Sequence, residues 1–276
     1  MYTLFFSAGG NIEQPHVDAM AERGIALAEV GQTDVFTGRL PEVTGDTRLA
    51  SGMGSIAFLR RLPGMCSLPL HIFFSSQLHH FSRYQYLIPE GRLLNSQGIA
   101  FPFSYVAKMG LEALTERLPG NARNTVFCRP DSGLKICEAE VIERGNYAEW
   151  LAYTSSNTGV EPHSWMWFFP VQDIKVEYRC LVSKGRVASI STYGFGKEPV
   201  NMDHDKGLVR VANLLIDGIE WDDPVVMVDI AETALGLKIV EANCFASSGL
   251  YALNPSTVAD EFKNALEGVY EDCFAL

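Results

Sequence analysis

The sequence predicts a small α/β lobe followed by a mostly antiparallel α+β body. The lobe is indicated by an apolar run at 2–6, a helix-like stretch at 15–24 and a second apolar run at 25–30. Strand, helix and strand in this order form a βαβ unit, which predicts a parallel sheet with a right-handed crossover. Beyond residue 124, apolar runs follow one another across short glycine-containing turns, as in antiparallel hairpins. We therefore expect an α/β lobe at residues 1–105 and an α+β body at residues 106–276.

The individual elements follow from hydrophobic periodicity and from turn residues. In the lobe, a Gly-Ser turn leads into a short amphipathic helix within 52–62, and 68–74 is expected as the next strand. Residues 103–120 have helical periodicity and end at a Pro-Gly pair. In the body we expect strands on both sides of a turn within 124–142, and further strands at 165–170, within 175–194 around Lys184-Gly185, at 224–233 and at 236–243. Helices are expected at 205–219 and 256–273.

Composition restricts the class of protein. The chain has 276 residues, of which 47% are hydrophobic and 20% charged, as in soluble globular enzymes. A net charge of -11 argues against nucleic acid as a partner, because phosphate-backbone binding requires a basic face, but it allows nucleotide binding by a local cluster of cations. No apolar run approaches the roughly 20 residues of a membrane span, and the first residues lack the pattern of a signal peptide. Six scattered cysteines fit reduced thiols, so we expect a cytoplasmic location.

Acidic and amide side chains end two neighbouring predicted strands. Asp229 follows the apolar run at 225–228, while Glu241 and Asn243 follow the run at 237–240. The two-residue period of a strand places Glu241 and Asn243 on one face, where a hairpin can bring Asp229 beside them. Carboxylate and amide oxygens are typical ligands of Mg²⁺. A magnesium site is one interpretation, and exposed strand-end residues are the other.

Two further segments suit a nucleotide. Arg129 leaves an apolar strand, and Lys135 follows it across a turn that contains Gly133, which would suit a phosphate cradle, although such a turn is also common in plain hairpins. The extended segment 168–179 presents apolar side chains, among them Val171 and Ile174, and ends in an acid and a cation. A flat heterocycle can lie along such a segment, and the acid can accept a hydrogen bond from a ribose hydroxyl.

Together these segments resemble the ATP-grasp superfamily of carboxylate–amine (or carboxylate–thiol) ligases. The segment VEANCFASSGLY at 240–251 is similar to the terminal metal motif of that superfamily, and Asp229 matches its preceding metal-binding acid. The segment DIKVEYR at 173–179 is similar to the linker that holds adenine and ends in a ribose-binding Glu, here Glu177. The segment VFCRPDSGLK at 126–135 resembles the strand and loop that cover the phosphates.

The resemblance implies a fold, cofactors and site residues. Residues 1–105 would be a pre-ATP-grasp lobe on the acceptor-substrate side, and 106–276 an ATP-grasp domain whose subdomains, at about 106–169 and 170–276, grip ATP with antiparallel sheets. The cofactors would be ATP and one or two Mg²⁺ ions. The resemblance implies Asp229, Glu241 and Asn243 as metal ligands; Arg129, Lys135, Val171, Ile174 and Glu177 as nucleotide ligands; and Arg179 and Lys135 as catalytic cations.

The implied reaction is a ligation. ATP would phosphorylate a carboxylate, and an amine would then displace phosphate, with small-molecule or peptide substrates and with a homodimer among the options for the oligomeric state. No nucleic acid or membrane partner is expected. Two alternatives stay open: a catalytically silent ATP-grasp protein that binds a nucleotide or a partner, and a kinase-like phosphotransferase.

Two features depart from the usual ATP-grasp pattern. Arg129 stands where lysine is common, and CFASSGLY at 244–251 replaces the common Pro-Gly after Glu-x-Asn. The Arg-Pro turn and the Asn…Ser-Gly-Tyr ending are similar to those of a small ATP-grasp group. Ser247 and Ser248 are expected either to touch phosphate or the acceptor substrate, or to form a self-bonded polar turn.

Three histidines lie close together in the sequence, at His71, His79 and His80. They invite a metal-site interpretation, but their spacing does not match the usual ligand patterns. Ordinary core or surface histidines are the favoured interpretation.

Overall fold

The computed structural model describes residues 1–8, 12–43, 45–119, 124–194 and 198–274. The chain forms two compact units, each made of segments that are separate in sequence. Unit 1 comprises Met1–Ser75, Val176–Ile230 and Ala242–Leu276, and unit 2 comprises Ser76–Lys175 and Ala231–Glu241. Within the described ranges, no helix combines the length and the apolar character needed to cross a membrane.

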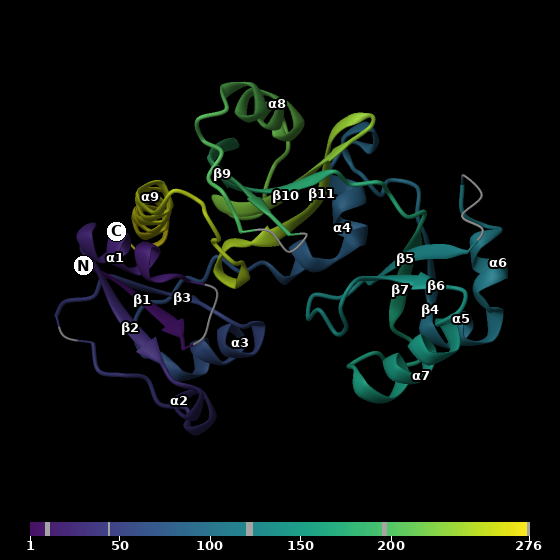
Figure 1. Cartoon of the computed structure of the whole chain (residues 1–276). Coiled ribbons are helices and arrows are strands. Elements are labelled where there is room, and N and C mark those ends of the chain that lie inside the picture. The colour runs from purple at the N-terminus through teal and green to yellow at the C-terminus, as the bar shows by residue number, and fades with distance from the viewer. Residues whose placement is uncertain (9–11, 44, 120–123, 195–197, 275–276) are drawn as a thin grey trace. The chain divides into compact units, whose positions relative to one another are not determined.

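Helices and strands alternate along most of the chain (Figure 1). The strands are β1 (Tyr2–Ser7), β2 (Ile25–Val30), β3 (Leu49–Met53), β4 (Ile99–Pro102), β5 (Thr125–Pro130), β6 (Glu140–Glu143), β7 (Trp165–Phe169), β8 (Val176–Ser183), β9 (Arg186–Tyr193), β10 (Val225–Thr233) and β11 (Gly236–Cys244). The α-helices are α1 (Gln14–Glu22), α2 (Gln32–Thr37), α3 (Ile56–Met65), α4 (Phe81–Leu87), α5 (Phe103–Met109), α6 (Leu111–Thr115), α7 (Tyr147–Asn157), α8 (Lys206–Ile216) and α9 (Pro255–Phe274). Short 3-10 helices are η1 (Ser76–His79), η2 (Glu90–Arg92) and η3 (Phe245–Ser247).

A three-stranded parallel sheet forms the N-terminal part of unit 1, in the order β2-β1-β3. Alternate side chains of β1 enter different cores, as the two-residue period of a strand requires. Leu4 packs with Met20 of α1 and with Phe262 of α9, whereas Phe5 packs with Phe58 and Leu62 of α3. The sheet therefore has helices α1 and α9 on one face and α3 on the other, which confirms the predicted parallel arrangement (Figure 1).

The second sheet has the strand order β11-β10-β8-β9. Strands β8 and β9 are antiparallel and joined at Lys184-Gly185, as the sequence predicts, but a β-bulge between Leu181 and Val182 shifts their register. Helix α8 packs beside β9. The ends of β10 and β11 near their connecting turn group with unit 2, and the remainder of both strands groups with unit 1.

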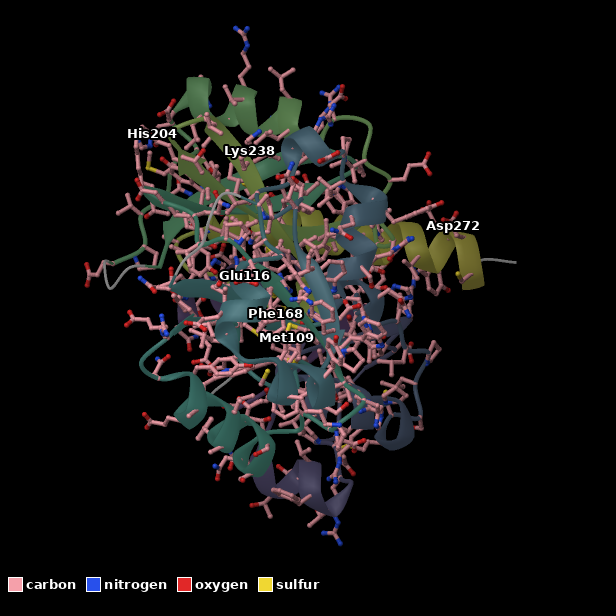
Figure 2. All side chains as sticks on the ribbon, turned by 90° about the vertical axis from the view of Figure 1, so that its right-hand side faces the viewer. Met109, Glu116, Phe168, His204, Lys238 and Asp272 are labelled. Atoms are coloured by element: carbon pink, nitrogen blue, oxygen red, sulfur yellow. The ribbon has the colours of Figure 1, made fainter. Side chains whose placement is uncertain are left out.

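Unit 2 contains an antiparallel sheet in the order β4-β7-β5-β6. Helices α5, α6 and α7 contribute to a core around Phe168, which is fully buried on β7. Met109 of α5 packs against this core, and it lies close to Phe168 in Figure 2. This sheet carries the predicted phosphate-binding strand β5.

Two predicted elements differ from the structure. The segment 68–74 is not a regular strand: its main-chain pairing with β3 is an isolated parallel bridge between Ala50 and Leu70. Pro69 has no N–H to donate, which limits a continuous ladder there. The predicted helix at 103–120 is two helices, α5 and α6, because Gly110 adopts a positive φ of 77° between them.

Candidate active site

A buried ion pair between Arg179 of β8 and Asp229 of β10 is the centre of the candidate site in unit 1. Arg179 Nε donates to Asp229 Oδ1 over 2.8 Å, and Nη2 donates to Oδ2 over 2.7 Å. The side chains are 7% and 0% exposed. A bidentate guanidinium–carboxylate pair fixes the direction of both groups.

Two neighbours complete the hydrogen bonding of this pair. Asn243 Nδ2 donates to Asp229 Oδ2 over 3.3 Å, and Arg179 Nη1 donates to the carbonyl oxygen of Gly249 over 3.1 Å. Burial alone would lower the pKa of Arg179, but the Asp229 carboxylate raises that pKa overall, so the guanidinium stays charged. Three adjacent strands and the turn after β11 thus supply a fixed cation, a carboxylate and an amide.

Two tyrosines that the sequence reasoning missed contact the guanidinium. The Cζ atom of Arg179 lies 4.6 Å from the ring centroid of Tyr193 and 4.9 Å from that of Tyr251. Tyr193 also pairs directly with Glu177 across β8 and β9, so the predicted ribose ligand lies on this face of the sheet. The only signal in the sequence was position, since each tyrosine ends a strand or a turn next to a predicted site residue.

A second polar cluster lies in unit 2, where Arg129 of β5 meets Glu241 of β11. Arg129 Nη1 lies 3.4 Å from Glu241 Oε2. The guanidinium also lies over the rings of Phe81 and Tyr84, with Cζ 5.7 Å and 5.2 Å from their centroids. Its Nε is buried and has no hydrogen-bond partner among the described residues. Arg129 is therefore a buried cation with remaining capacity to donate.

The histidines at 79 and 80 belong to the same cluster. Burial, and next the nearby Lys135 ammonium, lowers the pKa of His79 to about 4, while Glu241 acts in the opposite direction. His79 is therefore a neutral imidazole close to predicted nucleotide and metal ligands. His80 Nδ1 lies 3.6 Å from Asp131 Oδ1 at the start of the β5–β6 loop. The favoured interpretation as ordinary histidines overlooked this position.

Gly133 in the β5–β6 loop is explained by close packing within unit 2. A Cβ atom at this position would lie 3.0 Å from the carbonyl oxygen of Ser76 and 3.1 Å from His80 Nε2. Leu134 N donates to Ser132 Oγ inside the loop. The glycine thus lets the loop that carries Lys135 approach η1 closely.

The predicted adenine linker joins β7 to β8 without regular secondary structure. Val171 is 43% exposed, and Ile174 is half-buried. Pro170 and Gln172 line a cavity of about 280 Å³. This volume is near the lower end of small-molecule sites.

The serine turn after β11 is partly self-bonded. Ser248 Oγ donates to the carbonyl oxygen of Cys244 over 2.7 Å, and Ser248 N donates to the carbonyl oxygen of Phe245. The structure therefore gives Ser248 the self-bonded role that the sequence left open. Ser247 is half-buried in η3.

The predicted metal ligands are partly brought together. Asp229 and Asn243 are hydrogen-bonded in unit 1, while Glu241, two residues before Asn243 on β11, contacts Arg129 in unit 2. Asn243 presents its amide nitrogen to Asp229, so its Oδ1 lies at the other end of the amide group. These oxygens fit a hard divalent cation. Among the described residues, no set of three or more His, Cys, Asp or Glu side chains forms a metal site, and the predicted donor set includes the Asn243 amide instead.

Comparisons with known proteins agree with this geometry. A family model described as an ATP-grasp domain, the third family of its clade, matches residues 87–262. A search of curated proteins finds no match.

Solved structures with a similar fold cover nearly the whole chain. A D-cycloserine synthetase superposes with a TM-score of 0.63 at 12% identity, covering 96% of this chain and all of that one. The D-alanine–D-alanine ligase of Bacillus anthracis, complexed with ATP, has a TM-score of 0.60 at 10% identity and 98% coverage of both chains. The ATP-grasp ligase PsnB, complexed with a precursor peptide and AMPPNP, has a TM-score of 0.54 at 11% identity, covering 96% of this chain and 97% of that one.

Proposed function

The chain belongs to this ATP-grasp domain family, and we propose that it is an ATP- and Mg²⁺-dependent ligase. It activates a carboxylate as an acyl phosphate and joins it to an amine. The observation that carries this proposal is the buried cluster of Arg179, Asp229 and Asn243, which combines a fixed cation with oxygen donors. Phosphoryl transfer needs both, because negative charge must be neutralised on the transferred group and on its metal.

The proposed reaction has two steps. An oxygen of the substrate carboxylate attacks the γ-phosphorus of ATP, the bond to the β-phosphate oxygen breaks, and ADP leaves. The amine then attacks the acyl carbon, phosphate leaves, and the amine loses a proton to form the amide. Arg179 stabilises the negative charge on the transferred phosphoryl oxygens in both steps. Its fixed position means that little reorganisation is needed during the reaction.

The other site residues have supporting roles. Asp229, Asn243 and Glu241 are the proposed holders of Mg²⁺, which supplies charge neutralisation on the phosphate oxygens when bound. Arg129 and Lys135 are the proposed cations for the ATP phosphates. Support for Arg129 comes from its buried Nε, which lacks a hydrogen-bond partner among the described residues.

The adenosine part of ATP is assigned to the linker and the start of β8. We place adenine against Val171 and Ile174, and a ribose hydroxyl at Glu177. The two named ligases and the synthetase with this fold give the substrate class: a small-molecule or peptide carboxylate and an amine.

One observation favours a second candidate function, a silent nucleotide-binding protein. Both oxygens of Asp229 accept hydrogen bonds from Arg179, so the carboxylate already has a cation as partner. A permanent ion pair of this kind would compete with a metal ion. Turnover measurements separate the two candidates.

The test is the release of ADP and phosphate from Mg·ATP with a mixture of amino acids and short peptides. We expect ADP only when a carboxylate and an amine are both present, and an amide product by mass spectrometry. ADP formation with a hydroxyl compound alone would indicate a kinase instead. Nucleotide binding without ADP formation would indicate the silent protein.

The variant Asn243→Leu tests the metal role, since leucine has a similar size but no oxygen. We expect the rate of ADP formation to fall about 100-fold and the Mg²⁺ concentration for half-maximal rate to rise. Asn264→Leu, at an exposed position on α9, is the matched control. An unchanged Mg²⁺ dependence in Asn243→Leu would remove Asn243 from the metal site.

A further inference from the structure

We propose that Tyr193 and Tyr251 are positioning residues that hold the Arg179 guanidinium in its catalytic place. This inference rests on the proposed function for its consequence and on the geometry of unit 1 for its evidence. It assigns a role to two residues that the proposed metal and nucleotide ligands do not include. The group on which they act is the guanidinium itself.

The first piece of evidence is the contact of both rings with one cation. The guanidinium carbon lies 4.6 Å from one ring centroid and 4.9 Å from the other, within the range of favourable cation–π contact. The centroids of the two rings are 5.1 Å apart, and their planes differ by 26°. The tyrosines therefore form one stacked aromatic pair against which Arg179 rests.

The second piece of evidence is the backbone of Tyr251, whose φ is 45°. This left-handed conformation is unusual for a bulky residue and persists where the surroundings demand it. Tyr251 follows Gly249, whose carbonyl oxygen accepts a hydrogen bond from Arg179 Nη1. The same turn thus contacts the guanidinium twice, once through a carbonyl group and once through a ring.

This arrangement explains how Asp229 can serve both Arg179 and a metal. A guanidinium has five N–H groups, of which three donate to Asp229 and Gly249, so two remain for phosphate oxygens. When Asp229 shifts an oxygen toward a cation, Arg179 loses part of its anchoring. The aromatic pair and the Gly249 carbonyl then keep the guanidinium in place.

The test compares leucine and phenylalanine at each tyrosine. Phenylalanine keeps the ring face and leucine removes it, so Tyr193→Phe and Tyr251→Phe should resemble the wild type. Tyr193→Leu and Tyr251→Leu should lower kcat for ADP release about tenfold with little change in the KM for ATP. Tyr270→Leu is the matched control, because Arg48 lies over the Tyr270 ring at 5.9 Å elsewhere in unit 1.

A second readout does not depend on turnover. In protein labelled with ¹⁵N-arginine, the Nε–H resonance of Arg179 is identified by its loss in Arg179→Lys. Two rings near the guanidinium should shift this resonance and slow its exchange with water. Both effects should disappear in the leucine variants and persist in the phenylalanine variants and in Tyr270→Leu.

The outcomes separate this inference from the proposed function. If the wild type releases no ADP with any substrate but the resonance responds as expected, the ligase proposal fails and the positioning of Arg179 stands. If the leucine variants keep the resonance of the wild type, or its full kcat, the positioning role is overturned even in an active ligase. Thermal unfolding of each variant shows whether a loss reflects the fold instead.

Discussion

At the residue scale, the buried pair of Arg179 and Asp229 restricts how the site can be tested. Desolvating two charges is costly, and removing one partner leaves the other unpaired in the interior, at a cost of about 3–5 kcal/mol. Asp229→Asn or Asp229→Ala would therefore change the stability of unit 1 together with any metal affinity. Asn243 is the better probe, because it is neutral and contributes one hydrogen bond of 3.3 Å to the pair.

A single histidine supports the turn that carries Tyr251. His16 of α1 is buried, and its Nε2 lies 3.1 Å from the carbonyl oxygen of Leu253. Burial lowers the pKa of His16 below 6.5, although this hydrogen bond acts in the opposite direction. Its Nδ1 is buried without a hydrogen-bond partner among the described residues. Protonation would place an unpaired charge on this nitrogen.

This gives a pH dependence with a definite sign. Because the folded-state pKa of His16 is below the unfolded value of 6.5, the unfolded chain binds more protons as the pH falls through that region. We expect the free energy of unfolding to fall between pH 7.5 and 5.5, by up to about 1.4 kcal/mol per pH unit from this residue. His16→Gln, which keeps a hydrogen-bond donor, should flatten this part of the profile.

Urea unfolding at pH 7.5, 6.5 and 5.5 measures the effect. His204→Gln, at an exposed position in unit 1, should leave the profile unchanged. If His16→Gln and the wild type lose stability in parallel, His16 does not carry the pH dependence.

At the element scale, the β5–β6 loop should depend on the close approach at Gly133. Gly133→Ala places a methyl group 3.0 Å from a main-chain oxygen, so either the loop or η1 must move. We expect lower stability by about 1–3 kcal/mol and weaker binding of AMPPNP, because the loop carries Lys135 and follows Arg129. Isothermal titration with the nucleotide and thermal unfolding measure the two effects.

Gly145 provides a matched control in the turn between β6 and α7. An added Cβ there meets nothing within 4 Å, so Gly145→Ala should bind nucleotide like the wild type. Equal nucleotide affinity in both alanine variants would show that the loop position does not matter for binding.

The hairpin of β8 and β9 shows what the sequence could predict of an element and what it could not. Both strands and the turn at Lys184-Gly185 follow from alternation and turn residues. Counting back from that turn would pair Glu177 with Thr192, since Ser183 pairs with Arg186. The bulge near Leu181 moves the partner by one residue, so Glu177 pairs with Tyr193 instead. A bulge depends on local packing, and for this reason the role of Tyr193 was missed.

At the scale of the whole molecule, the family and the fold class were within reach of the sequence, but the polar clusters were not. The segments 126–135, 173–179 and 240–251 carry local spacings that resemble the ATP-grasp pattern, and the family match at 87–262 confirms the superfamily. The contacts of Arg129 with Glu241 and of Arg179 with Asp229 join residues far apart in the chain. Such pairings depend on tertiary packing. The domain boundary near residue 105 stays a prediction.

Hydrogen exchange tests the nucleotide assignment in both units at once. We expect AMPPNP with Mg²⁺ to slow amide exchange about tenfold in 129–135 of unit 2 and in 243–251 of unit 1, because ligand binding lowers the population of open states. With EDTA in place of Mg²⁺, protection should persist in 129–135, where the phosphate cations lie, and weaken in 243–251, which depends on the metal.

The variants Arg129→Ala and Asn243→Leu should separate these two responses. Arg129→Ala should lower nucleotide affinity and thus reduce protection in both segments at a fixed concentration, with recovery at higher concentration. Asn243→Leu should make 243–251 insensitive to Mg²⁺ while 129–135 stays protected. Protection confined to unit 2, with and without Mg²⁺, would contradict the assignment of Asp229 and Asn243 to the metal. It would also favour the silent nucleotide-binding protein, because the cation of Asp229 would then be Arg179 alone.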